Sequence, residues 1–274
     1  MFIEISDLKS PEIALYNDRA ETKLYHYYEP EPGLFIAETP VVIERALAAG
    51  YEPVSVLGEE KIIAEQEALL QTFPKELPVY VCTSKVLSEI AGYRLARGLL
   101  CAMRRKRPAS AEDVCKKASR VVLLEEVQNP TNVGAVFRCA AALGMDAVLL
   151  TKGCSDPLYR RASRVSMGNV FLVPWAYFDE RISPSDRIVL LKEQGFYTAA
   201  MALGEHCVLL GSQDFSKHEK LAVIMGTEST GLNPETIEAC DASVMIPMTG
   251  GVDSLNVAAA AAVAFWEFGK ISKS

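Results

Sequence analysis

Three short clusters of polar residues and glycines in the second half of the chain could carry chemistry, because each directly follows an apolar run. The first, QNPTNVGAVFR at residues 128–138, follows LLEEV and contains Asn132 and Arg138. Asn132 can cap the helix that begins there, and the free N–H groups at a helix N-terminus attract anions. Arg138 falls on the second turn of this helix, where we expect it to serve the same site. A capped helix with a solvated or salt-bridged arginine is the simpler alternative.

The second cluster, GTESTGL at residues 226–232, follows the apolar run LAVIM. Gly226 permits a tight turn close to a ligand, and Glu228 places a carboxylate at the mouth of the expected strand. The competing interpretation is a strand-to-helix turn, with Glu228 near the dipole of the helix that begins around Asn233 and Pro234.

The third cluster, IPMTGGVDSLNV at residues 246–257, runs directly into an Ala-rich stretch. Ser254 is the expected N-cap of that helix. Asn256 is an amide in an otherwise apolar segment, and a buried amide needs hydrogen-bond partners. It is therefore either a polar anchor in the core or a ligand contact.

Continuous Val, Ile and Leu runs alternate with helical patterns around these clusters, which indicates an α/β domain with a parallel sheet covered on both faces. Strands are expected at 121–127, 147–150, 170–173, 196–201, 221–225 and 243–248, and helices at 133–143, 182–194, 234–240 and 255–268. Ligands of such sheets bind beyond the carboxyl ends of the strands, which is where the three clusters lie.

The first part of the chain predicts a smaller α/β domain. Strands are expected at 33–37, 54–57 and 79–82, and helices at 40–49, 59–71 and 84–91. The run RRKRPAS lacks apolar periodicity and contains a proline, so we place the boundary there. The expected division is a domain at 1–107, a linker at 108–118 and a second domain at 119–274.

Composition indicates an ordinary globular protein: 274 residues, 50% hydrophobic and 23% charged. The seven cysteines include no CxxC pair and lie in apolar stretches, which favours free buried thiols, a reducing compartment and a cytoplasmic location. The N-terminus lacks the pattern of a signal peptide. The longest apolar run, 257–266, is about half of the ~20 residues that a membrane span needs, so no membrane association is expected.

The net charge of −7 argues against a nucleic-acid partner as a bulk number, but the charge is unevenly distributed. Residues 85–120 hold 10 Lys and Arg against 3 Asp and Glu, whereas the flanking segments are acidic. Within this basic band, residues 104–107 read Arg104, Arg105, Lys106 and Arg107. They form either a solvated linker or a surface that contacts phosphates.

Taken together, NPTNVGAVFR, GTESTG and IPMTGGVDSLNVAAA resemble the three motifs of the SpoU (TrmH) family of RNA 2′-O-ribose methyltransferases, over roughly residues 119–272. The resemblance implies a deep trefoil knot, a homodimer and S-adenosyl-L-methionine (AdoMet) as methyl donor without a metal. By position, the implied cofactor pocket comprises Met201, Gly226, Ile246 and Leu255. The implied polar residues of the reaction centre are Asn132, Arg138, Glu228, Ser254 and Asn256, with the arginine reaching across from the other subunit. One departure is Ala258, where many relatives have serine.

Residues 33–57 and 79–105 resemble the ribosomal-protein-like substrate-binding domain that precedes the knotted domain in many of these enzymes. This resemblance implies that the basic band, Arg94, Arg97 and residues 104–107, binds RNA. Ribosomal RNA is the preferred substrate and transfer RNA the alternative. Arg160, Arg161, Arg164 and Lys152 form a second, smaller basic patch that is either an RNA contact or a solvated loop.

Transfer of a methyl group to a ribose 2′-hydroxyl is an in-line displacement that needs alignment and removal of a proton. A guanidinium is a poor proton acceptor at neutral pH, so we expect Arg138 to grip a phosphate and stabilise the developing alkoxide. The proton would pass to that phosphate, to water or to Glu228. The rival interpretations are a non-catalytic protein that binds AdoMet or RNA, and a dinucleotide-dependent enzyme, which the absence of a GxGxxG motif disfavours.

Overall fold

A computed structural model of the chain describes residues 2–17, 24–25, 32–92, 98–204, 206–251 and 254–269. The chain separates into two compact units. The first unit comprises residues 1–107 and 158–171, and the second comprises residues 108–157 and 172–274.

The second unit is built on a seven-stranded sheet in the order β10-β12-β9-β11-β6-β7-β8, in which all adjacent strands are parallel. The strands are β6 (Arg120–Leu124), β7 (Ala147–Leu150), β8 (Trp175–Tyr177), β9 (Tyr197–Met201), β10 (Val208–Leu209), β11 (Leu221–Met225) and β12 (Ala242–Met245). Every residue of the neighbouring strands β6 and β11 is buried, as continuous apolar runs predict. The predicted α/β class with a parallel sheet is confirmed. The trefoil knot implied by the resemblance stays a prediction.

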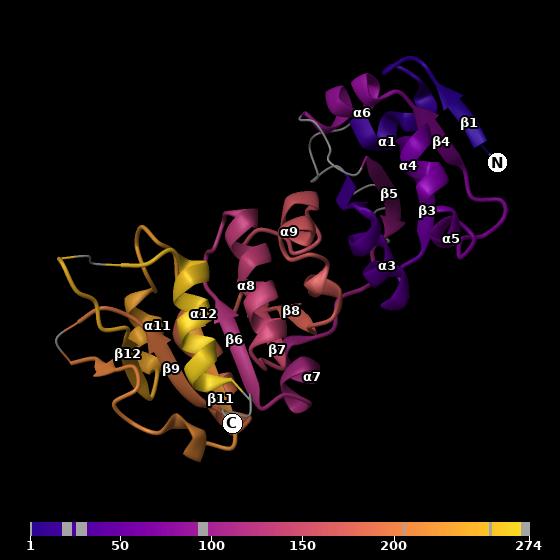
Figure 1. Ribbon diagram of the computed structural model, residues 1–274. Helices are drawn as coiled ribbons and strands as arrows, with labels where there is room; N and C mark the ends of the chain where they lie inside the picture. Colours follow the sequence, from indigo (N-terminus) through magenta and orange to yellow (C-terminus); the bar gives the residue numbers. More distant parts are fainter. Residues whose placement is uncertain are drawn as a thin grey trace. The chain divides into compact units, whose positions relative to one another are not determined.

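Helices cover both faces of this sheet. They are α7 (Ala111–Lys116), α8 (Pro130–Ala142), α10 (Pro184–Glu193), α11 (Pro234–Ala239) and α12 (Val257–Phe268), with the short 3-10 helix η3 (Phe215–Lys217). Residues of α7, α10 and α11 share a buried cluster with Val121 and Leu123 of β6. Because successive strand residues point to opposite faces, Val122 and Leu124 face the other way. Helices α8 and α12 lie side by side over that other face (Figure 1).

Several predicted boundaries were wrong. Residues 170–173 are not a strand: the 3-10 helix η2 (Asn169–Phe171) lies there, and the sheet strand starts after Pro174, at Trp175. Strand β12 ends at Met245, three residues before the predicted end, because Pro247 cannot donate to a strand ladder. The segment 108–118, expected to be a linker, contains α7, and Val114 and Cys115 of that helix are buried in the core of the second unit.

The first unit contains a mixed five-stranded sheet in the order β1-β4-β3-β5-β2, parallel between β1, β4 and β3 and antiparallel between β3, β5 and β2. Its strands are β1 (Phe2–Ile5), β2 (Leu34–Glu38), β3 (Pro53–Glu59), β4 (Val79–Cys82) and β5 (Leu99–Arg104). Its helices are η1 (Pro11–Ile13), α1 (Ala14–Asn17), α3 (Pro40–Ala48), α4 (Glu60–Glu65), α5 (Glu67–Leu70) and α6 (Ser84–Ala91), joined by α9 (Arg160–Val165) and η2. The predicted small α/β domain is thus present, and it includes a segment from the second half of the sequence.

A buried carboxylate holds helix α9 in the first unit. The side chain of Glu38 is only 3% exposed, and its oxygens lie 2.7 Å from Arg164 Nη1 and 3.4 Å from Arg160 Nε. Arg45 Nη1 donates to the carbonyl oxygen of Met167 at 2.8 Å. Two arginines of the patch considered for RNA contact are therefore engaged in an internal ion-pair cluster, which favours a structural role for them.

All seven cysteines are free thiols, and four of them are buried. Burial raises the pKa of Cys82 and Cys115 to about 11, so these thiols stay protonated at neutral pH. Among the described residues, no helix is both long enough and apolar enough to cross a membrane.

Candidate active site

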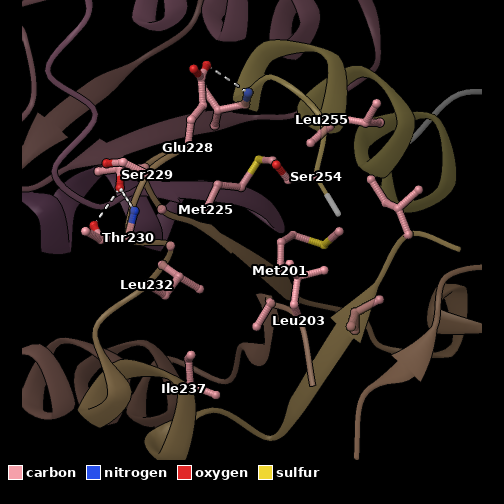
Figure 2. A pocket seen from close by; sticks show the side chains of 18 of the residues that line it. Met201, Leu203, Met225, Glu228, Ser229, Thr230, Leu232, Ile237, Ser254 and Leu255 are labelled. Atoms are coloured by element: carbon pink, nitrogen blue, oxygen red, sulfur yellow. Dashed lines mark hydrogen bonds between the residues drawn. The ribbon is translucent and has the colours of Figure 1, made fainter. Parts of the chain in front are cut away.

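A cavity of about 380 Å³ lies at the carboxyl ends of β9, β11 and β12 in the second unit. Figure 2 shows Met201 and Met225, the last residues of β9 and β11, at this cavity. Its walls come from the segment after β9, the loop after β11, helix α11 and the segment that leads into α12. The lining residues are Met201, Ala202, Leu203, Met225, Gly226, Thr227, Glu228, Ser229, Thr230, Gly231, Leu232, Ile237, Val244, Ile246, Met248, Ser254, Leu255, Val257 and Ala260.

All four residues that the resemblance assigns to cofactor binding line this cavity: Met201, Gly226, Ile246 and Leu255. Sequence reasoning missed Met225 and Met248, although each is adjacent to or inside a quoted motif. It also missed Leu203 and Ile237, which lie outside the motifs. Position at the end of a sheet strand would have identified Met225, because residues there border the ligand crevice of parallel sheets.

The loop after β11 approaches itself so closely that Gly226 has no room for a side chain. A Cβ atom on Gly226 would lie 2.3 Å from the carbonyl oxygen of Gly231. Thr227 and Gly231 exchange two backbone hydrogen bonds of 3.1 Å, which close the loop. Gly231 itself has a φ of 69°, in the region that favours glycine. The two glycines thus fix a compact loop that forms one wall of the cavity.

The three motifs meet at the carboxylate of Glu228. Its Oε1 accepts hydrogen bonds from Asn132 Nδ2 at 2.7 Å, from Asn256 Nδ2, and from the backbone N–H of Val257 at 3.3 Å. Asn256 Nδ2 also lies 3.2 Å from Asn132 Oδ1. Figure 2 shows the contact between Glu228 and the N-terminus of α12. A single side chain therefore connects α8, the loop after β11 and α12.

Both predicted helix caps were wrong by two or three residues. Asn129 caps α8, because its side chain accepts from Thr131 N at 2.9 Å and Pro130 occupies the first turn. Asn256 caps α12, because its Oδ1 accepts from Ala258 N at 3.0 Å. Asn132 and Ser254 are thereby left for other contacts, Asn132 with Glu228 and Ser254 at the cavity wall.

Arg138 does not line this cavity. It lies on α8 six residues after Asn132, which places the two side chains about 120° apart around the helix. The side chain is exposed, and within the described parts of the chain it makes no hydrogen bond or ion pair. The expectation that Arg138 serves the same site as Asn132 within one chain is therefore not met.

The residues of the basic run at the end of β5, 104–107, differ in their burial and in their contacts. Arg105 is half-buried: its Nε donates to the carbonyl oxygen of Leu34 at 3.0 Å, and its guanidinium lies 4.7 Å from the ring centre of Tyr25. Arg104, Lys106 and Arg107 are exposed, although Lys106 Nζ also donates to the carbonyl oxygen of Ala49 at 2.5 Å. Arg94 and Arg97 lie outside the described residues.

Comparison with known proteins assigns the chain to a family. The SpoU rRNA Methylase family model matches residues 119–266. An uncharacterized tRNA/rRNA methyltransferase of Mycobacterium bovis is 40% identical over 235 residues, which cover 85% of this chain and 80% of that protein. A 23S rRNA (guanosine-2′-O-)-methyltransferase of Acinetobacter baylyi is 29% identical, covering 74% of this chain and 82% of that protein.

The fold comparison agrees with the sequence comparison. The crystal structure of an AdoMet-bound rRNA methyltransferase from Sinorhizobium meliloti superposes with a TM-score of 0.79 at 25% identity, over 97% of both chains. The agreement extends over the first unit as well as the sheet that carries the cavity. The chain therefore belongs to the SpoU rRNA methylase family, as its three motifs predict.

Proposed function

We propose that this protein transfers a methyl group from AdoMet to a ribose 2′-hydroxyl of RNA. The observation that carries the proposal is the convergence of all three family motifs on Glu228, at the rim of a cavity at the carboxyl ends of parallel strands. The relative from Acinetobacter baylyi supports the 2′-oxygen as the acceptor, because it is named a guanosine-2′-O-methyltransferase.

The cavity suits AdoMet in size and chemistry. Its volume of about 380 Å³ lies within the ordinary range for small-molecule sites. Methionine, leucine and isoleucine side chains offer apolar contacts to a nucleoside, and the loop of residues 226–232 lines the cavity along its whole length. Among the described residues that line the cavity, Glu228 is the one with a charged side chain, and its negative charge suits a cationic ligand. When bound, AdoMet supplies a methyl carbon activated by a sulfonium.

The chain's own residues then have two tasks, which are to orient the attacking oxygen and to stabilise its developing charge. Arg138 is suited to the second task, because a guanidinium stays charged and binds a phosphate through two parallel hydrogen bonds. The proton leaves to that phosphate, to water or to Glu228. Glu228 Oε1 already accepts three N–H donors, so a proton taken by this carboxylate would go to Oε2.

A homodimer would bring Arg138 to a cavity that it does not reach in its own chain. Helix α12 presents an exposed apolar stripe, with Val263 41% and Trp266 56% exposed. Ala259 continues this stripe at helical spacing, and the adjacent α8 carries Arg138. Exposed aromatic and aliphatic side chains of this kind mark interaction surfaces. We therefore propose that two chains pair through the α8 and α12 faces.

Ribosomal RNA is the proposed substrate, with transfer RNA as the alternative that the mycobacterial relative's name leaves open. The exposed cations at the end of β5, together with Arg94 and Arg97, are the proposed RNA contacts. Mapping of ribose methylations in total RNA from a deletion strain and its parent would identify the substrate as the one site that disappears.

Replacement of Arg138 by lysine tests the catalytic assignment. We expect Arg138→Lys to bind AdoMet with wild-type affinity in calorimetry, because the proposed contact of Arg138 is a phosphate of the RNA and not AdoMet. Transfer of a tritiated methyl group to unmodified RNA should fall nearly to background, since lysine cannot reproduce the bidentate geometry. Unchanged turnover would remove Arg138 from the mechanism. A wild-type protein that binds AdoMet without transfer would instead indicate a non-catalytic binding protein.

A further inference from the structure

A buried carboxylate that the mechanism does not use lies directly behind the cavity wall. Glu125 follows the last residue of β6 and is only 4% exposed. Its Oε1 accepts from the backbone N–H of Asn233 at 2.6 Å, and its Oε2 accepts from Thr236 Oγ1 at 2.6 Å. In the described part of the chain, no lysine or arginine pairs with it.

Both partners of Glu125 belong to the segment that closes the cavity. Asn233 is the N-cap of α11 and directly follows Leu232, the last cavity residue of the loop after β11. Thr236 is fully buried and precedes Ile237, which lines the cavity from α11. Glu125 therefore holds the point at which the loop becomes a helix.

The opposite end of the same loop is fixed by the sheet. Gly226 follows β11, and the backbone N–H of Glu125 donates to the carbonyl oxygen of Met225 at 2.9 Å. One residue thus contacts the start of the cavity loop through its backbone and the end of the loop through its carboxylate. The intervening residues 226–232 all line the cavity.

We propose that Glu125 is a positioning residue for AdoMet, and that it sets the shape of the cavity wall formed by residues 226–232 and Ile237. A buried charge with neutral donors only is costly in a protein interior, and an apolar side chain would fill the same space at lower cost. A carboxylate can, however, fix two groups at once, because each of its oxygens accepts a hydrogen bond. Glu125 accepts one short hydrogen bond from the backbone N–H of Asn233 and one from the hydroxyl of Thr236. This inference rests on the proposed function, because it assumes that AdoMet occupies the cavity.

The first test is calorimetric titration of AdoMet into the full-length protein and its variants. Glu125→Ala removes both hydrogen bonds of the carboxylate, and we expect the Kd for AdoMet to rise about tenfold or more. Glu125→Gln keeps an acceptor for Asn233 and can donate to the Thr236 hydroxyl, so its Kd should stay within about threefold of wild type. Glu126→Gln makes the same chemical change on the next residue, an exposed carboxylate that accepts from Thr151 Oγ1, and should not alter the Kd.

Thr236→Val provides a nearly isosteric variant in case Glu125→Ala does not fold. It removes only the hydroxyl that Glu125 accepts from, and we expect the Kd for AdoMet to rise several-fold. In steady-state kinetics, Glu125→Ala and Thr236→Val should show a higher KM for AdoMet, while kcat at saturation and the affinity for RNA stay unchanged. General destabilisation of the protein would not produce this pattern. Folded Glu125→Ala or Thr236→Val protein with wild-type AdoMet affinity would overturn the inference. Failure of the wild-type protein itself to bind AdoMet would instead contradict the proposed function.

Discussion

Single buried polar side chains connect separate elements of the second unit, and Arg120 is an example. This residue begins β6 and is 8% exposed. Its guanidinium donates to the carbonyl oxygens of Phe268, Ser119, Glu219 and His218 at 2.9–3.0 Å. The bond to Phe268 ties the last turn of α12 to the first residue of a central strand, which lies 148 positions earlier.

Replacement of Arg120 by methionine should therefore destabilise the second unit. The variant keeps a long apolar stem but leaves four carbonyls without their charged donor, and we expect a loss of about 3 kcal/mol in the free energy of unfolding. Urea unfolding measures it. Arg181→Met is the matched control, because that arginine is exposed and its guanidinium pairs with the neighbouring Asp179 at the surface, so its loss should leave the stability close to that of wild type. Equal stability of the two variants would refute a structural role for Arg120.

At the scale of elements, the sheet edge next to the cavity depends on a carboxylate that joins three segments. Asp241 precedes β12, and its Oδ2 accepts from the backbone N–H and the hydroxyl of Thr198 in β9, both at 2.8 Å. Its Oδ1 lies 2.9 Å from Lys192 Nζ near the end of α10. Although burial alone would raise the pKa of Asp241, the hydrogen bonds from Lys192 and Thr198 hold it below its ordinary value.

The lowered pKa of Asp241 determines how the contribution of this residue to folding stability changes with pH. A carboxylate whose pKa is lower in the folded than in the unfolded protein stabilises the fold above the unfolded value, about 3.9 for aspartate. That stability is lost as the pH falls through the lower, folded value. We expect Asp241→Asn to be about 1 kcal/mol less stable than wild type at pH 7, and the difference to shrink below about pH 4. Thermal unfolding between pH 7 and pH 3 measures it, and a difference independent of pH would contradict the assignment.

The same elements show what a sequence can and cannot predict. The buried strands β6, β7 and β11 were predictable because a fully buried parallel strand is a continuous apolar run. Residues 170–173 have the same local pattern, but Val170 is buried in the first unit instead of in the sheet. The Asn129-Pro130 pair is a helix start that could have been recognised, since proline favours the first helical position. The meeting of Asn132, Glu228 and Asn256 required the fold, because no local spacing relates residues that lie 28 to 124 positions apart.

At the scale of the whole molecule, the net charge of −7 conceals a short basic run whose members have different roles. Arg105 is half-buried against Leu34 and Tyr25, which makes it part of the first unit's structure. Arg104, Lys106 and Arg107 are exposed at and beyond the end of β5. Arg105 therefore has a structural role in the first unit, and the three exposed residues are the members of the run that we propose to contact RNA phosphates.

Neutralisation of these exposed cations should weaken RNA binding and make the binding constant less dependent on the salt concentration. Removal of one cation that binds a phosphate lowers the slope of log K against log salt by about 0.7–0.9, so Arg104→Gln, Lys106→Gln and Arg107→Gln together should reduce it by about 2 to 3. Filter binding to an unmodified 23S rRNA transcript over a range of salt concentrations measures the slope. Changing Lys61, Lys75 and Lys217 to glutamine alters the net charge equally at exposed positions outside the run, and should leave the slope near that of wild type. If both triple variants lowered the slope alike, the RNA would be responding to total charge, and the specific role of the β5 end would have to be abandoned.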